Sequence, residues 1–502
     1  MSTSVTTFIH LLLAVAMASS TSCLRDLNPV QLSQDGVLQA TNWVRTSMDL
    51  LHGFANTKSI SSSAGQNVAL MDCARLYDES APRLTVLLSG EGNYTGDDAR
   101  TWLSGVLANH MSCWEGLEEK SFVTSSTRHY VAVAQNLTLM LGEALALYEK
   151  STMTDEAKRG VPNNGQNSNP KPSGGLLASW TPGTSRADFV VAKDGSGTHT
   201  TINEALAALA RMGHRRPPRA IIYVKSGVYN EKVQIGRRMK NVMLVGDGMD
   251  KTIITGSGSV LDGSTTLTSA TFGVSGDGFW ARDITFQNTA GPQKQQAVAL
   301  RVSSDLAVFY QCSMKGYQDT LYTHSLRQFY RDCHIYGTID FIFGDAPVVL
   351  QNCDIFVRRP MGHQHNMITA QGRYNLQENT GIVIHGCRVR PARDFEGVKG
   401  SYRTYLGRPW QKYSRTIFLK TDLDGLVDPQ GWTEWRGSFA LSTLYYGEYM
   451  NVGVGASTEK RVRWPGFHVL NRPQEVSPFT VGRFIQGESW ILGTGVPVSL
   501  GI

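Results

Sequence analysis

Two aspartates, Asp319 and Asp340, lie 21 residues apart in segments that echo each other. The first segment is AVFYQCSMKGYQDTLY and the second is RQFYRDCHIYGTIDFIF, so an aromatic pair, a cysteine, a glycine and an aspartate recur in the same order. When two carboxyl groups are held close together, both cannot easily ionise, so we expect one pKa to rise and the other to fall. The sequence therefore suggests one acid and one base acting together.

The spacing of the later cysteines indicates which fold could hold the two aspartates together. The cysteines recur at intervals of 21, 20 and 34 residues, at Cys312, Cys333, Cys353 and Cys387. A period in the low twenties in short β-rich runs, with a loop enlarging the last interval, is typical of a parallel β-helix. Neighbouring strands of such a stack are roughly 4.8 Å apart, which predicts that the two aspartates face each other on adjacent coils.

An aspartate at a β-helix turn also has a structural interpretation, because its carboxylate often accepts hydrogen bonds from backbone amides. Two features favour a catalytic role for the two aspartates over a structural one. Polar and aromatic residues flank the pair, as in an open cleft: Gln318, Tyr322, Phe341 and Phe343. Further on, TYLGRPWQKYSRT supplies Arg408, a cation able to hold one carboxylate ionised, and Trp410, a ring able to stack on a sugar.

The chain before these repeats has a different pattern of apolar and polar residues. Residues 1–22 contain one apolar run, FIHLLLAVAMA, which is typical of a signal peptide, with a signal anchor as the alternative. Residues 23–157 carry apolar residues at helical spacing in four segments, which indicates an all-α four-helix bundle. Residues 158–186 include KRGVPNNGQNSNPKPSGG, which predicts a protease-accessible linker before the all-β part at 187–502.

Motifs across residues 187–502 are similar to those of plant pectinesterases, also called pectin methylesterases. They include GPQKQQAVALRV, GYQDTLY, GTIDFIFG and YLGRPW. The helical segments ALMDCARLYDESAPRL and TWLSGVLANHMSCWEGL resemble the invertase and pectin methylesterase inhibitor domain that precedes many of these enzymes. The resemblance implies a right-handed parallel β-helix behind an inhibitor-like pro-region, and hydrolysis of galacturonate methyl esters in pectin of the cell wall.

The resemblance also assigns roles to the residues that match its motifs. Asp340 is the expected nucleophile, and Arg408 is expected to keep the pKa of its carboxyl low. Asp319 is the expected proton donor and acceptor, and must begin protonated. The amides of Gln318 and Gln296 are expected to stabilise the transition state without adding charge. Expected substrate contacts are Thr266, Gln296, Arg408 and Trp410, and the chemistry requires no metal or cofactor.

Charge and glycosylation motifs agree with this class of partner and compartment. Residues 187–502 carry 35 Lys and Arg against 26 Asp and Glu, a net charge of +9. A basic solenoid is attracted to pectin as its methyl groups leave, although the charge could also serve solubility alone. We expect a secreted monomer with candidate glycosylation at Asn93 and Asn136, an inhibitor protein as a second partner, and no nucleic acid.

Seven cysteines in a secreted chain should partly pair. Stacked coils would place the Cα atoms of Cys333 and Cys353 near the roughly 5–6 Å that a disulfide prefers. The resemblance supports this pair, and Cys353 with Cys387 is the alternative. Cys73 and Cys113 match the second conserved pair of the inhibitor family.

The sequence departs from the family pattern in its pro-region. The first cysteine pair of the inhibitor family is missing, and KPSGGLLASW keeps the leucines but not the basic residues of the usual RRLL or RKLL processing motif. Cleavage at Lys158-Arg159, or no efficient cleavage, is therefore expected. Two other classes remain open: a lyase or polygalacturonase, which would need Ca²⁺-binding or glycosidase carboxylates, and a catalytically silent inhibitor or wall-binding protein.

Overall fold

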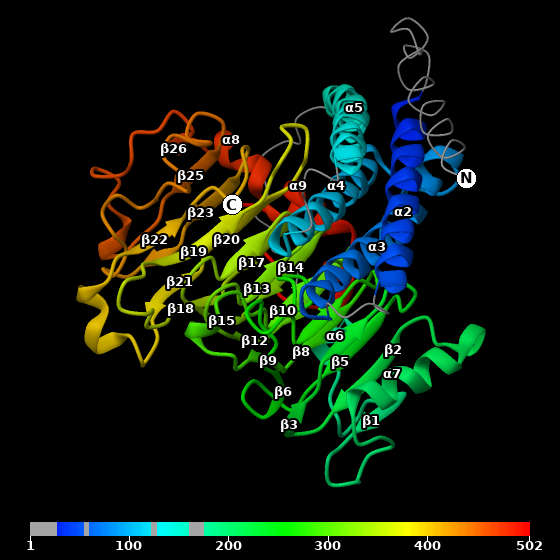
Figure 1. Cartoon of the computed structure of the whole chain (residues 1–502). Coiled ribbons are helices and arrows are strands. Elements are labelled where there is room, and N and C mark those ends of the chain that lie inside the picture. Colours follow the sequence, from blue (N-terminus) through cyan, green and yellow to red (C-terminus); the bar gives the residue numbers. More distant parts are fainter. Residues whose placement is uncertain (1–27, 55–59, 122–127, 160–174) are drawn as a thin grey trace, which may run out of the picture.

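A computed structural model describes residues 28–54, 60–121, 128–159 and 175–502 of the chain. The expected signal peptide, Cys23 and most of the expected linker lie outside these residues. Figure 1 shows a long stack of strands with the blue and cyan helices packed along one side of it. The chain thus combines a helical N-terminal part with an all-β part.

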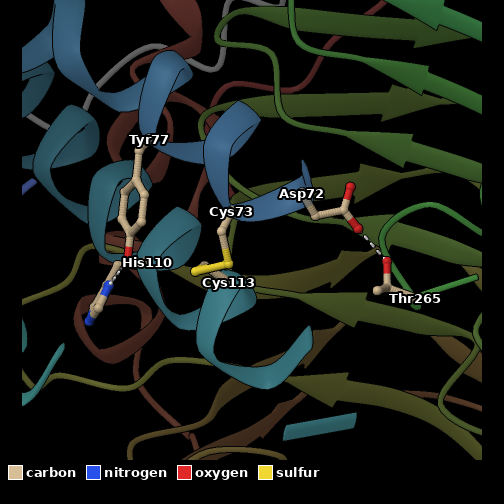
Figure 2. Close-up of a disulfide and its surroundings, with 6 residues drawn as sticks. All are labelled: Asp72, Cys73, Tyr77, His110, Cys113 and Thr265. Carbon is tan, nitrogen blue, oxygen red and sulfur yellow. Dashed lines mark hydrogen bonds between the residues drawn. A yellow bond between two sulfur atoms is a disulfide. The ribbon is translucent and has the colours of Figure 1, made fainter. Parts of the chain in front are cut away.

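The helices of the N-terminal part pack as a bundle in which each helix contacts two neighbours. They are α2 (Pro29–Phe54), α3 (Ile60–Ser89), α4 (Gly96–Glu119) and α5 (Arg128–Arg159). A capping box begins α4, since the Thr95 hydroxyl accepts a hydrogen bond from the Asp98 amide and the Asp98 carboxylate accepts one from the Thr95 amide. A disulfide joins Cys73 of α3 to Cys113 of α4, which confirms that predicted pair (Figure 2). The predicted four-helix bundle is likewise confirmed.

One stretch of α5, Val131–Glu149, is apolar and long enough to span a membrane by length and composition alone. In the structure its Leu137, Leu141 and Leu145 side chains are fully buried in the bundle core. An apolar core helix satisfies the same criterion as a membrane span. Three leucines of the stretch therefore belong to the bundle core, whereas Leu139 and Leu147 are exposed.

The β part is a stack of three parallel sheets, so the predicted parallel β-helix is confirmed. The first sheet contains β1 (Phe189–Val191), β2 (Ala220–Val224), β5 (Val242–Val245), β8 (Trp280–Arg282), β11 (Ala307–Tyr310), β14 (Gln328–Arg331), β17 (Pro347–Gln351), β20 (Gly381–His385), β23 (Arg415–Leu419), β25 (Tyr445–Tyr449) and β26 (Phe467–Val469). The second contains β4 (Val233–Ile235), β7 (Phe272–Val274), β10 (Leu300–Val302), β13 (Leu321–Thr323), β16 (Ile342–Gly344), β19 (Asn366–Gln371) and β22 (Thr404–Gly407). The third contains β3 (Gly227–Asn230), β6 (Thr252–Gly256), β9 (Thr285–Asn288), β12 (Ser313–Lys315), β15 (His334–Gly337), β18 (Asp354–Val357), β21 (Arg388–Pro391) and β24 (Asp422–Leu423).

The β part also contains the short helices α6 (Leu176–Ser179), α7 (Ile202–Arg211), α8 (Pro473–Val476) and α9 (Val481–Phe484). Helix α7 contacts β1, β2 and β4 at one end of the stack, whereas α6, α8 and α9 pack against side chains of the first sheet. The segment that contains α6 is fastened to the stack, because the buried Arg282 guanidinium donates hydrogen bonds to the carbonyls of Leu177 and Trp180. Residues from about 175 onward therefore belong physically to the β-helix.

The corner between the first and third sheets repeats from coil to coil. Gln311, Asp332 and Asn352 have φ angles of 51°, 53° and 54°, in the left-handed region that Asn and Asp tolerate better than most residues. Each of them directly precedes a cysteine of the repeat. The left-handed corner turns that cysteine inward, where its side chain is buried.

The cysteine ladder contains no disulfide, so the predicted Cys333–Cys353 bridge is wrong, and so is the Cys353–Cys387 alternative. The backbone amide of Cys333 donates to the sulfur of Cys353 at 3.4 Å, and that of Cys353 to the sulfur of Cys387 at 3.3 Å. In-register stacking points equivalent side chains in the same direction. Each sulfur consequently lies against the backbone of the preceding coil, which suitable Cα spacing alone could not reveal.

The bundle is attached to the β-helix by both charge and apolar packing. Arg237 forms a two-point ion pair with Asp78 of α3 at 2.6 and 2.7 Å, and Arg327 pairs with Asp98 of α4 at 2.7 Å. The bundle core also continues into apolar side chains of the β-helix: Leu267, Ala270, Val298, Tyr322, Phe343 and Ala370. Close approach requires Gly105 of α4, where an added Cβ would lie 2.7 Å from a methyl carbon of Leu326.

Candidate active site

The two aspartates occupy equivalent positions on adjacent coils, as the 21-residue period predicts. Leu321 of β13 is in register with Ile342 of β16, and each aspartate lies two residues before its strand partner. Asp319 and Asp340 have φ angles of 62° and 49°, and left-handed backbone at a non-glycine residue costs energy that the surrounding stack must supply. The Asp319 amide donates to the carbonyl of Ile339 at 3.0 Å, which ties the two corners together.

Arg408, the residue that follows β22, holds one of the two carboxylates. Its guanidinium donates to both oxygens of Asp340, from Nε at 2.9 Å and Nη2 at 2.6 Å. The same guanidinium lies 4.2 Å from the ring centroid of Trp435. A bidentate pair stacked on an indole fixes the orientation of Asp340 as well as its charge.

Burial and neighbouring charges give the two carboxyls different pKa values. Burial and the neighbouring charge of Asp340 raise the pKa of Asp319 well above its usual range. Burial also raises the pKa of Asp340, whereas Arg408 lowers it. The prediction that the pKa of Asp340 falls is therefore wrong for the chain with its bundle in place, because desolvation outweighs the guanidinium. The more strongly raised group is Asp319, the expected acid.

A cavity of about 280 Å³ lies over the pair, between the β-helix and the bundle. It is lined by every residue predicted for catalysis or substrate contact, namely Thr266, Gln296, Gln318, Asp319, Asp340, Arg408 and Trp410. Tyr322 and Phe343 stack at 4.3 Å between ring centroids and form an aromatic wall with Trp410, whereas Phe341 points into the β-helix core. Such a wall suits a sugar ring.

The side chain of Gln296 has an unused hydrogen-bond acceptor. The side-chain oxygen of Gln296 is buried without a hydrogen-bond partner in the described part of the chain. Buried polar atoms normally have partners, so an unsatisfied one at a cavity fits a ligand that arrives there. Trp435 was missed by the sequence analysis. The aromatic run GWTEWRG, just beyond YLGRPW, was the available signal.

Helix α4 forms the roof of the cavity. Ser112, Glu115, Gly116 and Glu119 recur at helical spacing on one face and all line it. The Glu115 carboxylate accepts a hydrogen bond from the Gln411 amide at 2.9 Å. The Glu119 carboxylate accepts from the backbone amide of Thr266 at 3.2 Å and from its hydroxyl at 3.3 Å. One predicted substrate contact is therefore already occupied by the bundle, which the sequence analysis did not foresee.

Comparison with known families and proteins shows the family to which the chain belongs. The family profile described as "Pectinesterase" matches residues 188–488, more than half of the chain. The chain belongs to the pectinesterase family. The profile "Plant invertase/pectin methylesterase inhibitor" matches residues 10–147, so this pectinesterase carries the inhibitor-type domain in the same chain. Membership makes it a carboxylic ester hydrolase, which removes the lyase and polygalacturonase alternatives.

Among its relatives, the Arabidopsis thaliana protein named "Probable pectinesterase/pectinesterase inhibitor 36" is 57% identical over 98% of each chain. "Pectinesterase 2" of Citrus sinensis is 50% identical over 87% of this chain and 82% of its own length. A solved pectin methylesterase from carrot is 53% identical, with a TM-score of 0.62, and matches 64% of this pectinesterase but 99% of the carrot chain. A pectin methylesterase of Aspergillus niger is 31% identical, with a TM-score of 0.53 over 61% of this chain and 96% of its own. The β-helix therefore exists without a bundle in the carrot structure.

Proposed function

We propose that this pectinesterase hydrolyses the methyl esters of galacturonate residues in pectin, through Asp340 as nucleophile and Asp319 as acid and base. The observation that carries the proposal is the unequal carboxyl pair on adjacent coils, one bound by Arg408 and the other raised in pKa. The aromatic wall of the cavity supports a saccharide as the ligand.

The geometry suggests a two-step reaction. Asp340 attacks the ester carbonyl, and the amides of Gln296 and Gln318 stabilise the negative charge that develops on its oxygen. The protonated carboxyl of Asp319 gives its proton to the leaving methanol as the acyl–enzyme bond forms. Asp319 then accepts a proton from the water that hydrolyses this bond, which frees the acid product and restores both groups.

Methanol release from highly methylated pectin tests the proposal. Asp340→Asn keeps the shape of the side chain but removes the nucleophile, so the rate should fall at least about a thousandfold. Asp394→Asn is the matched control, because Asp394 is an exposed carboxylate in a surface ion pair with Arg358. Undiminished methanol release by Asp340→Asn would refute the role of this residue, and equal losses in both variants would indicate a general effect on folding.

We also propose that the bundle blocks access to the active-site cavity until the chain is cut. We assign residues 1–22 to a signal peptide, 23–157 to the inhibitor-like bundle, 158–186 to the linker and processing region, and 187–502 to the catalytic part. Support comes from α4, whose Glu115 and Glu119 lie in the cavity. A specific protease site inserted between residues 160 and 174 should raise methanol release when it is cut and the bundle is washed away. An unchanged rate would show that the bundle does not inhibit.

We also propose that the enzyme is secreted to the cell wall and acts on pectin as a monomer. The exposed positions of Asn93 and Asn136 are compatible with glycosylation. A separate inhibitor protein could bind the open catalytic part where the bundle lies in the intact chain. A silent inhibitor or wall-binding role is disfavoured, since the full set of expected catalytic side chains lines one cavity.

A further inference from the structure

Glu448 and Arg461 form a buried ion pair that the proposed reaction does not use. Both side chains are 2% exposed, and the Arg461 guanidinium donates to both carboxylate oxygens of Glu448, at 2.7 and 3.0 Å. Glu448 lies on β25 two residues after Tyr446, so it points into the β-helix core with that ring. Apolar side chains of similar volume often stabilise such a position equally well. Stability alone therefore gives no reason for two charges here.

Both members of the pair bind the segment that follows β24. The indole N–H of Trp432 donates to the Glu448 carboxylate at 3.1 Å, and Arg461 donates to the carbonyl of Pro429 at 3.1 Å. At Gly431 the φ angle is 72°, and an added Cβ would lie 2.3 Å from Cδ of Arg461, so the arginine packs directly on this backbone. The ion pair therefore fixes the segment at three of its residues.

This segment lies against β22, the strand that leads to Arg408. The backbone amide of Leu406 donates to the carbonyl of Gly431 at 2.7 Å, and the amide of Thr433 donates to the carbonyl of Gly407 at 3.1 Å. A parallel bridge joins the same two stretches of backbone. The segment thus extends the second sheet beside the residues that end at Arg408.

Trp435 lies just beyond this bridge and contacts the proposed catalytic groups. Its ring centroid lies 4.2 Å from the Arg408 guanidinium, which donates to both oxygens of Asp340. The indole is only partly buried, and in the intact chain it packs against the apolar cluster shared with the bundle. Once the bundle leaves, the place of this ring depends on the backbone that carries it. That backbone is the one held by Glu448 and Arg461.

We propose that Glu448 and Arg461 are positioning residues, which hold Trp435 over Arg408 and thereby fix the angle at which Arg408 meets Asp340. The inference rests on the proposed function, and extends it to a buried pair that does not line the active-site cavity. A guanidinium that tilts loses its two-point contact with the carboxylate. It then lowers the pKa of the Asp340 carboxyl less than the aligned cation does.

The test is the pH profile of Glu448→Gln. The chain is cut between residues 160 and 174 and the bundle is removed, since the β-helix of the carrot structure exists without one. With the carboxylate gone, kcat/KM for methanol release from highly methylated pectin should fall about tenfold per folded molecule, as for a weakened contact between a cation and a ring. The acid limb of the profile should shift to higher pH.

Variants of Trp435 show whether the pair acts through this ring. Trp435→Leu should shift the acid limb in the same direction, and Trp435→Phe, which keeps an aromatic face, should restore most of the rate. Adding Glu448→Gln to Trp435→Leu should then reduce kcat/KM by less than about twofold, because the contact has already been lost. Losses that multiply in the double variant would overturn the inference.

Asp305→Asn is the matched control. It breaks another buried two-point ion pair of the β-helix, with Arg327, and Asp305 does not line the active-site cavity. This variant should lower the melting temperature without moving the acid limb. If Glu448→Gln does not fold, Arg461→Lys replaces it, because it keeps the charge beside Glu448 but loses the two-point contact. An equal shift of the limb in the control would overturn the positioning role.

The wild-type cut enzyme separates the two levels of the argument. If it releases no methanol, the proposed function fails and the inference fails with it. If methanol is released and Asp340→Asn abolishes the release, but Glu448→Gln lowers only stability or rate and leaves the acid limb in place, only the positioning role fails. A shift that Glu448→Gln and Trp435→Leu share, and Asp305→Asn lacks, supports it.

Discussion

Arg408 donates hydrogen bonds to both carboxylate oxygens of Asp340, whereas the equivalent carboxyl one coil earlier, Asp319, receives no hydrogen bond of this kind from it. The two groups share a corner geometry, so their difference comes from the residue that follows β22 and not from their own turns. The stacked coils place two carboxyls in equivalent positions, and the charge of Arg408 beside one of them makes their pKa values different.

Replacing this cation should move the pH dependence of the reaction. Arg408 lowers the pKa of Asp340, so Arg408→Lys, which loses the two-point contact, should raise that pKa. Because Asp340 must be ionised to attack, the acid limb of the kcat/KM profile should shift to higher pH. This shift can be measured from methanol release by the cut enzyme between pH 4 and 9. A rate loss with an unshifted acid limb would mean that Arg408 only binds substrate.

Attachment of the bundle should weaken as the pH rises. Burial, with smaller effects from the charges of Glu118 and Glu119, raises the pKa of Glu115 to about 8. The ordinary value is about 4.3, so between about pH 4.3 and 8 the docked state holds a proton that the separated bundle has lost. Docking therefore loses stability across this window and levels off above it.

Glu115→Gln provides the check, because it keeps a polar group opposite Gln411 but cannot titrate. In a chain cut between residues 160 and 174, the affinity of the bundle for the catalytic part should depend less on pH in this variant than in the wild type. Glu119, Asp319 and Asp340 border the same cavity and their pKa values are also raised, so some dependence should remain. If the affinity of the variant depends on pH as strongly as that of the wild type, these other carboxyls and not Glu115 cause the pH dependence. Glu143→Gln, at an exposed site on α5, is the control.

The catalytic part should contain four free thiols. Cys312, Cys333, Cys353 and Cys387 are buried and unpaired. Burial raises the pKa of Cys312 to about 12, so its thiolate is scarce in the folded protein. Residues 175–502 should react with a thiol reagent only after unfolding, and then with four equivalents in the absence of reductant. Two equivalents would restore one of the disulfides predicted from the sequence.

The disulfide of the bundle should contribute measurably to its stability. Cys73 and Cys113 are separated by 40 residues, and closing a loop of this size stabilises a fold by about 2–4 kcal/mol. Cys113→Ser should lower the free energy of unfolding of the bundle by that amount in a denaturant titration. Reductant should reproduce the loss in the wild type and add nothing in the variant. A further loss in the variant would show that reductant acts elsewhere.

Much of the active site follows from periodicity along the chain. The 21-residue interval places Asp319 against Asp340 because each coil repeats the same three strands, and stacking transmits a local spacing into space. The roles expected for Gln296, Gln318 and Arg408 came instead from the resemblance of their motifs to a known family. Reasoning from the coil period misjudged Cys333 and Cys353, because stacking fixes the distance between backbones but also makes the side chains parallel.

The sequence by itself determined the coil period, the carboxyl pair and the division into a helical and a β part, since these depend on patterns within one segment. Only the tertiary structure decided what lies over the pair. Asp72 contacts Thr265 across 193 residues, and α4 brings Glu115 into the cavity. These contacts, and the raised pKa of Asp340 beneath them, depend on the fit of two separately folded surfaces. No spacing along the chain encodes that fit.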